Sequence, residues 1–128
     1  MAKKVLSIVE SAYRATVEEQ DDTILWMNHI LKNAGLDITL VLRSNAVNYA
    51  VKGQDASGLT FGGLKVAHPP KIDKDLESLL EAGVPVYYVR EDAEERGVPQ
   101  KQIIDGVKAV SAKELPGMLD GFDSIWHW

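Results

Sequence analysis

The sequence contains no cysteine among its 128 residues. This absence excludes disulfide bonds, thiolate zinc sites, iron–sulfur ligation and covalent sulfur chemistry on the chain itself. The three histidines, His29, His68 and His127, are widely separated, so no local metal-ligand spacing is visible. We therefore predict neither a metal site nor a bound cofactor.

Long apolar runs and a basic face are also missing. The opening stretch MAKKVLSIVE has only a short apolar run before Glu10, which is too brief for a signal-peptide core and far short of a membrane-spanning helix. The formal net charge of −5 argues against binding to phosphate backbones, which normally needs a concentrated basic surface. We therefore expect a cytoplasmic protein that binds neither nucleic acid nor membrane.

The chain does contain enough apolar sequence for one globular domain. It is 45% hydrophobic and 26% charged, which predicts a single domain over residues 1–128. Apolar runs without alternation are typical of strands covered on both faces, and an alternating run predicts an edge strand. These patterns place strands at Val5–Val9, Leu36–Arg43, Val84–Val89, Val107–Val110 and Phe122–Trp128.

Helical segments are predicted between these strands. Asp21, Asp22 and Thr23 offer capping chemistry for a helix that Gly35 ends, and Gln54–Pro70 reads as a long irregular loop. The alternation of strands and helices predicts a three-layer α/β/α sandwich, flavodoxin-like, with a mainly parallel sheet of about five strands. The helices are expected at Ile24–Ala34, Asn45–Lys52, Ile72–Ala82 with Asp73 as its cap, Ala93–Arg96, and after Ser111, where Pro116 shortens or distorts the helix.

Polar residues follow several of the predicted strands. In open α/β sheets, ligands bind outside the carboxyl ends of the strands. Arg90 beside Glu91 would suit an anionic ligand such as a nucleotide or a carboxylate, because arginine is a fork-shaped donor. The alternative is a solvated helix start over Arg90–Glu95, where the helix dipole favours acidic groups. The candidates that would converge on one pocket are Glu10, Ser11, Asn45, Tyr88, Arg90 and Glu91.

The ordered features of the chain resemble the DsrE/DsrF-like family, small sulfur-relay subunits that include the TusBCD proteins of tRNA thiolation. The resemblance covers nearly the whole chain. It rests on an opening strand, a long first helix, an apolar strand like VKAVSA followed by a helix, and a closing strand near the C-terminus. Its central part is Gly83-Val84-Pro85-Val86-Tyr87-Tyr88-Val89 with Arg96-Gly97-Val98 at the family's spacing.

This resemblance has implications for chemistry and for assembly. Active members carry a persulfide on a cysteine at the end of this strand, and the matching position here is Val89, which cannot replace a thiolate. The resemblance also implies assembly into trimers or hexamers, by self-association or with related DsrE-like subunits. Tryptophan is over-represented at interfaces, so we predict that Trp26, Trp126 and Trp128 are interface residues.

Two functional interpretations follow. The first is a cysteine-less, non-catalytic binding or scaffolding subunit connected to sulfur metabolism. The alternative is a small-molecule binder or an enzyme that uses the pocket at the strand ends, with Val89 among its ligand-binding residues. A serine triad is disfavoured because neither Ser11 nor Ser44 lies in a G-x-S-x-G elbow, and GLTFGG lacks the Lys-Ser/Thr of a phosphate loop.

Overall fold

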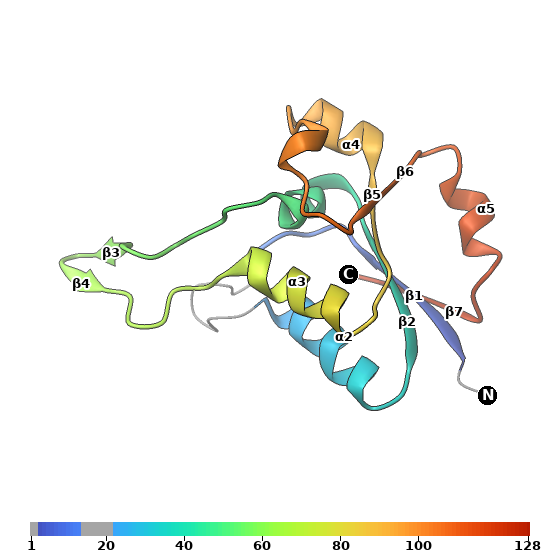
Figure 1. Cartoon of the computed structure of the whole chain (residues 1–128), viewed down its shortest axis with the longest axis horizontal. Coiled ribbons are helices and arrows are strands. Elements are labelled where there is room, and N and C mark those ends of the chain that lie inside the picture. Colours follow the sequence, from blue (N-terminus) through green and yellow to red (C-terminus); the bar gives the residue numbers. More distant parts are fainter. Residues whose placement is uncertain (1–2, 14–21) are drawn as a thin grey trace.

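A computed structural model describes residues 3–13 and 22–128. Five parallel strands form one sheet in the order β6-β5-β2-β1-β7 (Figure 1). The predicted α/β fold with a mainly parallel five-stranded sheet is therefore confirmed. The strands are β1 (Lys4–Val9), β2 (Asp37–Leu42), β5 (Val86–Val89), β6 (Lys108–Val110) and β7 (Ser124–His127).

Helices cover both faces of the sheet (Figure 1). On one face, α2 (Thr23–Asn33) and α3 (Ile72–Glu81) lie side by side, next to the 3₁₀ helix η1 (Ser44–Ala50). On the other face lies α5 (Leu115–Leu119). The remaining elements are α4 (Arg90–Glu95), which follows β5 directly, the 3₁₀ helix η2 (Gln100–Gln102), and a two-stranded hairpin of β3 (Thr60–Phe61) and β4 (Leu64–Lys65) that projects from the body.

The boundaries of α2 follow from its capping residues. Asp22 is the N-cap, and its Oδ1 accepts hydrogen bonds from the N–H groups of Ile24 and Leu25, each at 3.0 Å. These two hydrogen bonds satisfy backbone N–H groups that would otherwise be unpaired in the first turn of the helix. After Ala34 the chain turns at Gly35, whose φ of 103° is accessible to glycine at little cost. Asp22 thus fulfils the predicted capping role, while Asp21 lies outside the described residues.

Several expected element boundaries were wrong. The helix expected at Asn45–Lys52 is the 3₁₀ helix η1, and the loop expected over Gln54–Pro70 contains the β3–β4 hairpin. Asp73 does not cap α3, because the N-cap is Lys71 and makes no side-chain capping bond. The helix expected at Ala93–Arg96 begins earlier, because α4 spans Arg90–Glu95.

The last helix starts later than the capping pattern predicted. The Oγ of Ser111 does accept hydrogen bonds from the N–H groups of Lys113 and Glu114, at 3.2 and 3.4 Å. These bonds close a turn, and α5 begins only at Leu115. Pro116 explains the delay, because its nitrogen has no hydrogen to give to the carbonyl of residue 112.

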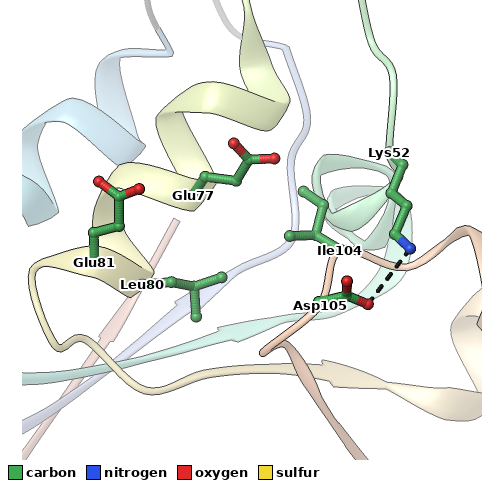
Figure 2. A pocket seen from close by; sticks show the side chains of 6 residues that line it. All are labelled: Lys52, Glu77, Leu80, Glu81, Ile104 and Asp105. Carbon is green, nitrogen blue, oxygen red and sulfur yellow. Dashed lines mark ion pairs between the residues drawn. The ribbon is translucent and has the colours of Figure 1, made fainter.

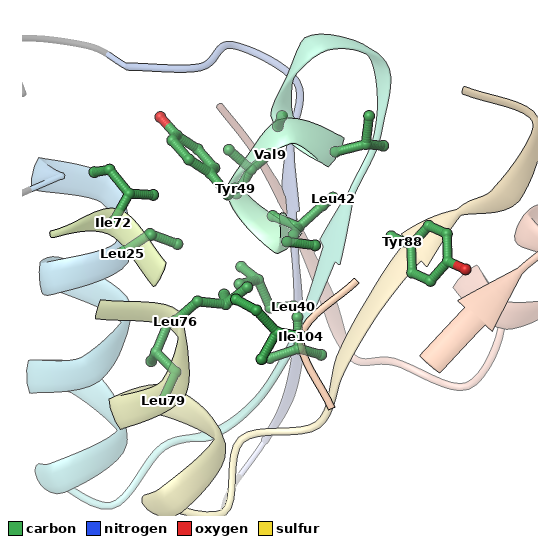
Figure 3. Packing of buried hydrophobic residues seen from close by; sticks show 14 of the residues in the cluster. Val9, Leu25, Leu40, Leu42, Tyr49, Ile72, Leu76, Leu79, Tyr88 and Ile104 are labelled. Carbon is green, nitrogen blue, oxygen red and sulfur yellow. The ribbon is translucent and has the colours of Figure 1, made fainter. Parts of the chain in front are cut away.

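Two hydrophobic clusters lie on opposite faces of the sheet. The larger one lies under α2, α3 and η1, and Figure 3 shows Leu40 and Leu42 of β2 facing Leu76 and Leu79 of α3. The smaller one joins the sheet to α5 and contains Leu6, Ile8, Val41, Val89, Val110 and Leu115. Because successive side chains of a strand point to opposite faces, Tyr88 and Val89 belong to different clusters.

A buried polar contact joins α2 to η1. Asp22 and Tyr49 are both fully buried, and the Tyr49 hydroxyl donates to Oδ2 of Asp22 while accepting the N–H of Tyr13. Burial, followed by the hydrogen bond to Asp22, raises the pKa of Tyr49 well above its ordinary value. The hydroxyl therefore keeps its proton, and this contact anchors the segment after β1 to the start of α2.

Candidate functional site

The carboxyl ends of β2, β5 and β6 meet beside α5 at a cavity of about 300 Å³. The N–H of Arg43, just after β2, donates to the carbonyl of Val9 at 3.0 Å. This hydrogen bond holds the ends of β1 and β2 together. We call this cavity the Val89 pocket. It is lined by Arg43, Val89, Asp92, Ala112, Leu115, Pro116 and Leu119.

The floor of the Val89 pocket is aliphatic. Val89 ends β5 with only 3% of its surface exposed, and it packs in the same cluster as Val110 and Leu115. The charged groups of the lining are Arg43 and Asp92. Because the sequence has no cysteine, the pocket contains no thiol. The pocket can hold a small molecule or a side chain, but it lacks a sulfur nucleophile.

Arg43 is held at the pocket by a row of polar contacts along the strand ends. Its Nε lies 3.0 Å from Oε1 of Glu10, and Oε2 of Glu10 lies 2.6 Å from Nε2 of His127. These side chains are one third to more than half exposed, so each of these polar contacts contributes less than about 1 kcal/mol to stability. The row therefore orients Arg43 more than it stabilises the fold.

A second group of contacts fixes the loop at the start of η1. Ser44 has a φ of 52°, and its N–H donates to Oδ2 of Asp92 at 2.7 Å. Arg96 donates to Oδ1 of Asn45 at 3.1 Å, to Oγ of Ser44 at 3.3 Å and to the carbonyl of Asp92 at 3.1 Å. The N–H group of Ser44 thus binds the carboxylate of Asp92 from the same chain.

The structure separates some of the predicted ligand-binding residues. Asn45 contacts Arg96, and the N–H of Ser11 donates to the carbonyl of Trp128 at 3.4 Å. Tyr88 faces the opposite side of the sheet, and the exposed Arg90 begins α4 outside the pocket lining. Of that predicted set, all of which the structure describes, Val89 alone lines the Val89 pocket.

Glu91 lies next to the pocket and holds one of its walls. Its Oε2 accepts the N–H of Ala112 at 2.8 Å, and this hydrogen bond lowers the pKa of the Glu91 carboxyl. The predicted ligand-binding set did not include Arg43, Asp92 or Arg96. The alternation of side chains along a strand could have indicated Arg43 as a residue of the site. Arg43 lies two residues after Val41, and Val41 packs on the same face of the sheet as Val89.

The three predicted interface tryptophans differ in exposure. Trp26 on α2 is 57% exposed, whereas Trp126 and Trp128 are half-buried and pack edge to face with ring centroids 6.4 Å apart. The indole Nε1 of Trp128 donates to Oγ of Ser7 at 3.0 Å. A cavity of about 430 Å³, which we call the edge groove, is lined by Met27, Leu31, Ile125, Trp126, His127 and Trp128.

A further cleft of about 470 Å³ lies between α3 and the segment before β6 (Figure 2). Its lining includes Lys52, which forms an ion pair with Asp105 at 3.4 Å, and Glu77, which pairs with Lys74 at 3.0 Å. None of the predicted site residues lines it. Its charged groups are exposed and partly paired with one another, so we do not assign a site there.

Two classes of feature are absent from the described part of the chain. Within residues 3–13 and 22–128, no three histidine, aspartate or glutamate side chains are grouped so that they could hold a metal ion. In the same ranges, no helix has the length and apolar character needed to cross a membrane.

No curated protein matches the chain. Solved structures, however, agree with this architecture. The crystal structure of the ychN protein from E. coli is similar with 24% identity, a TM-score of 0.72 and full coverage of both chains. A conserved protein of unknown function from Bacteroides thetaiotaomicron is 15% identical with a TM-score of 0.71, covering 98% of this chain and 95% of that one.

A protein of unknown function from Methanobacterium thermoautotrophicum is also similar, with 13% identity and a TM-score of 0.65, covering 97% of this chain and 98% of that one. At these identities the solved structures show a common fold. The match to a protein-family model is more specific, because it extends over residues 3–125 and is to the DsrE/DsrF-like family. The chain therefore belongs to the DsrE/DsrF-like family.

Proposed function

We propose that this protein is a non-catalytic binding subunit connected to intracellular sulfur relay. The observation that carries the proposal is Val89, which occupies the strand end where active relatives of this family carry their persulfide cysteine. A cavity of about 300 Å³ lies there, yet the chain has no thiol to accept sulfur. Family membership supports the connection to sulfur relay.

The projecting hairpin supports a role in binding a partner. We call residues 54–71, which include β3 and β4, the arm (Figure 1). Its tip exposes Leu59, Phe61 and Leu64, with 41%, 58% and 77% of their surfaces accessible. Exposed apolar groups gathered on one projection are typical of protein-binding surfaces. The arm therefore offers an apolar surface to a cysteine-bearing subunit.

The base of the arm is fixed by hydrogen bonds. Nε2 of Gln54 donates to the carbonyls of Asn48 and Val51 at 2.8 and 2.9 Å. Oε1 of Gln54 accepts the hydroxyl of Tyr13 at 2.6 Å. These bonds tie the first residue of the arm to the end of η1 and to the segment after β1. A fixed base lowers the entropy cost of presenting the tip to a partner.

We expect the protein to assemble with cysteine-bearing DsrE-like subunits from the same cell. Native mass spectrometry of the co-expressed proteins should show a mixed complex, and Phe61→Lys should weaken it at least about tenfold because a charge is then buried at the contact. Trp26→Lys is the matched control, since Trp26 is 57% exposed but lies on α2. Failure of the wild-type protein to associate with any such subunit would contradict the proposal.

A second candidate function is the binding of a small anion at Arg43. Its Nε pairs with Glu10, and the residue lines the Val89 pocket. Arginine presents several donors in a fixed fork that matches planar anions. The sequence had pointed to Arg90 for this role, but the pocket lining contains Arg43.

Arg43 and Arg90 can be compared directly as candidate anion-binding residues. In thermal-shift measurements with thiosulfate, nucleotides and small carboxylates, a ligand of the pocket should raise the unfolding temperature of the wild type because it binds only the folded state. Arg43→Ala should abolish this rise, and Arg90→Ala should leave it unchanged. A rise that depends on Arg90 instead, or the absence of any rise, would exclude anion binding at Arg43.

A further inference from the structure

We propose that two copies of this chain pair antiparallel along the outer edge of β7, with α2 of each copy packing beside the joined strands. This inference goes beyond the proposed function, because it assigns the β7 edge to a second copy of the chain. It rests on three features: the free backbone groups of β7, a continuous apolar surface beside them, and the self-complementarity of the strand.

The first feature is the hydrogen-bonding pattern of β7. Trp128 donates its N–H to the carbonyl of Ile8 at 2.9 Å, and its own carbonyl accepts the N–H of Glu10 at 2.9 Å. In a parallel pair, alternate residues face the same neighbour, so the N–H and C=O groups of Ile125 and His127 point away from β1. Because β7 is the last strand of the sheet, no strand of the described chain pairs with them.

Within residues 3–13 and 22–128, this edge lacks the features that usually prevent pairing. Proteins protect exposed edges with proline, lysine, bulges or covering elements. The sequence Ser124–His127 contains neither lysine nor proline, and its pairing with β1 is regular. The exposed side chains at this edge are Ile125 and His127. In the described part of the chain, nothing therefore prevents β7 from pairing with another strand.

The second feature is an apolar surface that continues from the edge groove onto α2. Met27 and Leu31 line the groove. At 100° per residue, Ile30 and Trp26 follow them around the helix on the side away from the buried Leu25. Ile30 is 48% exposed and Trp26 57%. Ile125 is 43% exposed, but its side chain points to the α5 face, like that of its β1 partner Leu6. Covering this surface and the strand edge in two copies would bury on the order of 1,000 Å², which is about the minimum for a specific interface.

The third feature selects a second copy as the occupant. A two-fold interface needs a surface that complements itself. When the two-fold axis passes beside Trp126, Ile125 of each copy lies opposite His127 of the other copy. The outward N–H and C=O groups of Ile125 then form hydrogen bonds with those of the facing His127, and the axis repeats this pairing a second time. The same axis relates the two α2 surfaces and covers Trp26 and Ile30 with their own counterparts.

The first test measures the mass of the protein in solution by analytical ultracentrifugation. We expect an assembly with an even number of copies, and both Ile125→Lys and Trp26→Lys should raise its dissociation constant at least about tenfold. Phe61→Lys is the matched control, because Phe61 is 58% exposed but lies on the arm. A monomeric or trimeric wild type would overturn the proposal, as would dissociation caused by Phe61→Lys alone.

The second test checks the strand register in this cysteine-free chain. Facing residues of a hydrogen-bonded antiparallel pair have Cα atoms about 5.5 Å apart, which is within disulfide range. With diamide as the oxidant, a mixture of Ile125→Cys and His127→Cys chains should form a disulfide-linked dimer, and neither chain alone should do so efficiently. Equal cross-linking of either chain alone would overturn this register. Trp26→Lys and Phe61→Lys also separate the two proposals, since the mixed complex should respond only to Phe61→Lys.

Discussion

Asp22→Ala should lower the free energy of unfolding by about 3 kcal/mol, the largest effect we expect from a single polar substitution in this chain. The carboxylate is fully buried and performs two tasks at once. Oδ1 caps α2 through the N–H groups of Ile24 and Leu25, and Oδ2 accepts the hydroxyl of Tyr49. Alanine removes the cap and leaves a buried hydroxyl without its acceptor. Urea unfolding followed by circular dichroism measures the loss.

Two variants separate these contributions. Asp22→Asn retains an oxygen that can cap α2, so its loss should be smaller than that of Asp22→Ala. Tyr49→Phe removes only the hydroxyl, and we expect a loss of about 1–3 kcal/mol. In the Tyr49→Phe background, Asp22→Ala should cost less than in the wild type, because the two side chains interact. Additive losses in the double variant would show that the buried contact does not couple the two sites.

Val89→Cys should give a thiol that alkylating reagents modify at least about ten times more slowly than an exposed one. Val89 is only 3% exposed in the cluster beneath α5, and burial in apolar surroundings hinders formation of the reactive thiolate. Thr60→Cys on the exposed strand β3 is the matched reference. Because the natural chain has no cysteine, each variant carries a single thiol, and mass spectrometry after timed iodoacetamide treatment gives both rates.

The comparison needs a control for folding. The volumes of valine and cysteine are similar, so Val89→Cys should change the free energy of unfolding by less than about 1.5 kcal/mol. In denaturant the two thiols should react at the same rate, which shows that the folded structure causes the difference. Equal rates in the folded proteins would mean that the Val89 pocket opens readily, and that the position remains accessible to a sulfur donor.

Most strands and helices could be predicted because their apolar residues recur at the period of the element. Val5–Val9 and Leu36–Arg43 correspond to β1 and β2, and the Leu76 and Leu79 spacing marks α3. The arm was missed although it carried a signal. Gly62 and Gly63 both have positive φ, at 57° and 83°, and a Gly-Gly pair between Phe61 and Leu64 is typical of a two-residue hairpin turn.

The site was harder to predict than the fold. The Val89 pocket lies at the strand ends, where parallel strands bring their carboxyl ends to one edge of the sheet. Periodicity does not give the order of strands in the sheet, so the proximity of Glu10, Arg43 and His127 could not be read from the sequence. Tyr88 and Arg90 have suitable chemistry, but Tyr88 packs in the larger cluster on the other face of the sheet and Arg90 begins α4.

The first turn of α4 mechanically links the loops on both sides of β5. Asp92 binds the N–H of Ser44 in the loop after β2, and Glu91 binds the N–H of Ala112 in the loop after β6. Asp92 and Ala112 are also walls of the Val89 pocket. One short helix therefore sets the width of the cavity from two sides, and any tilt of α4 changes both walls together. The position of α4, the helix that follows Val89, therefore determines the dimensions of the Val89 pocket.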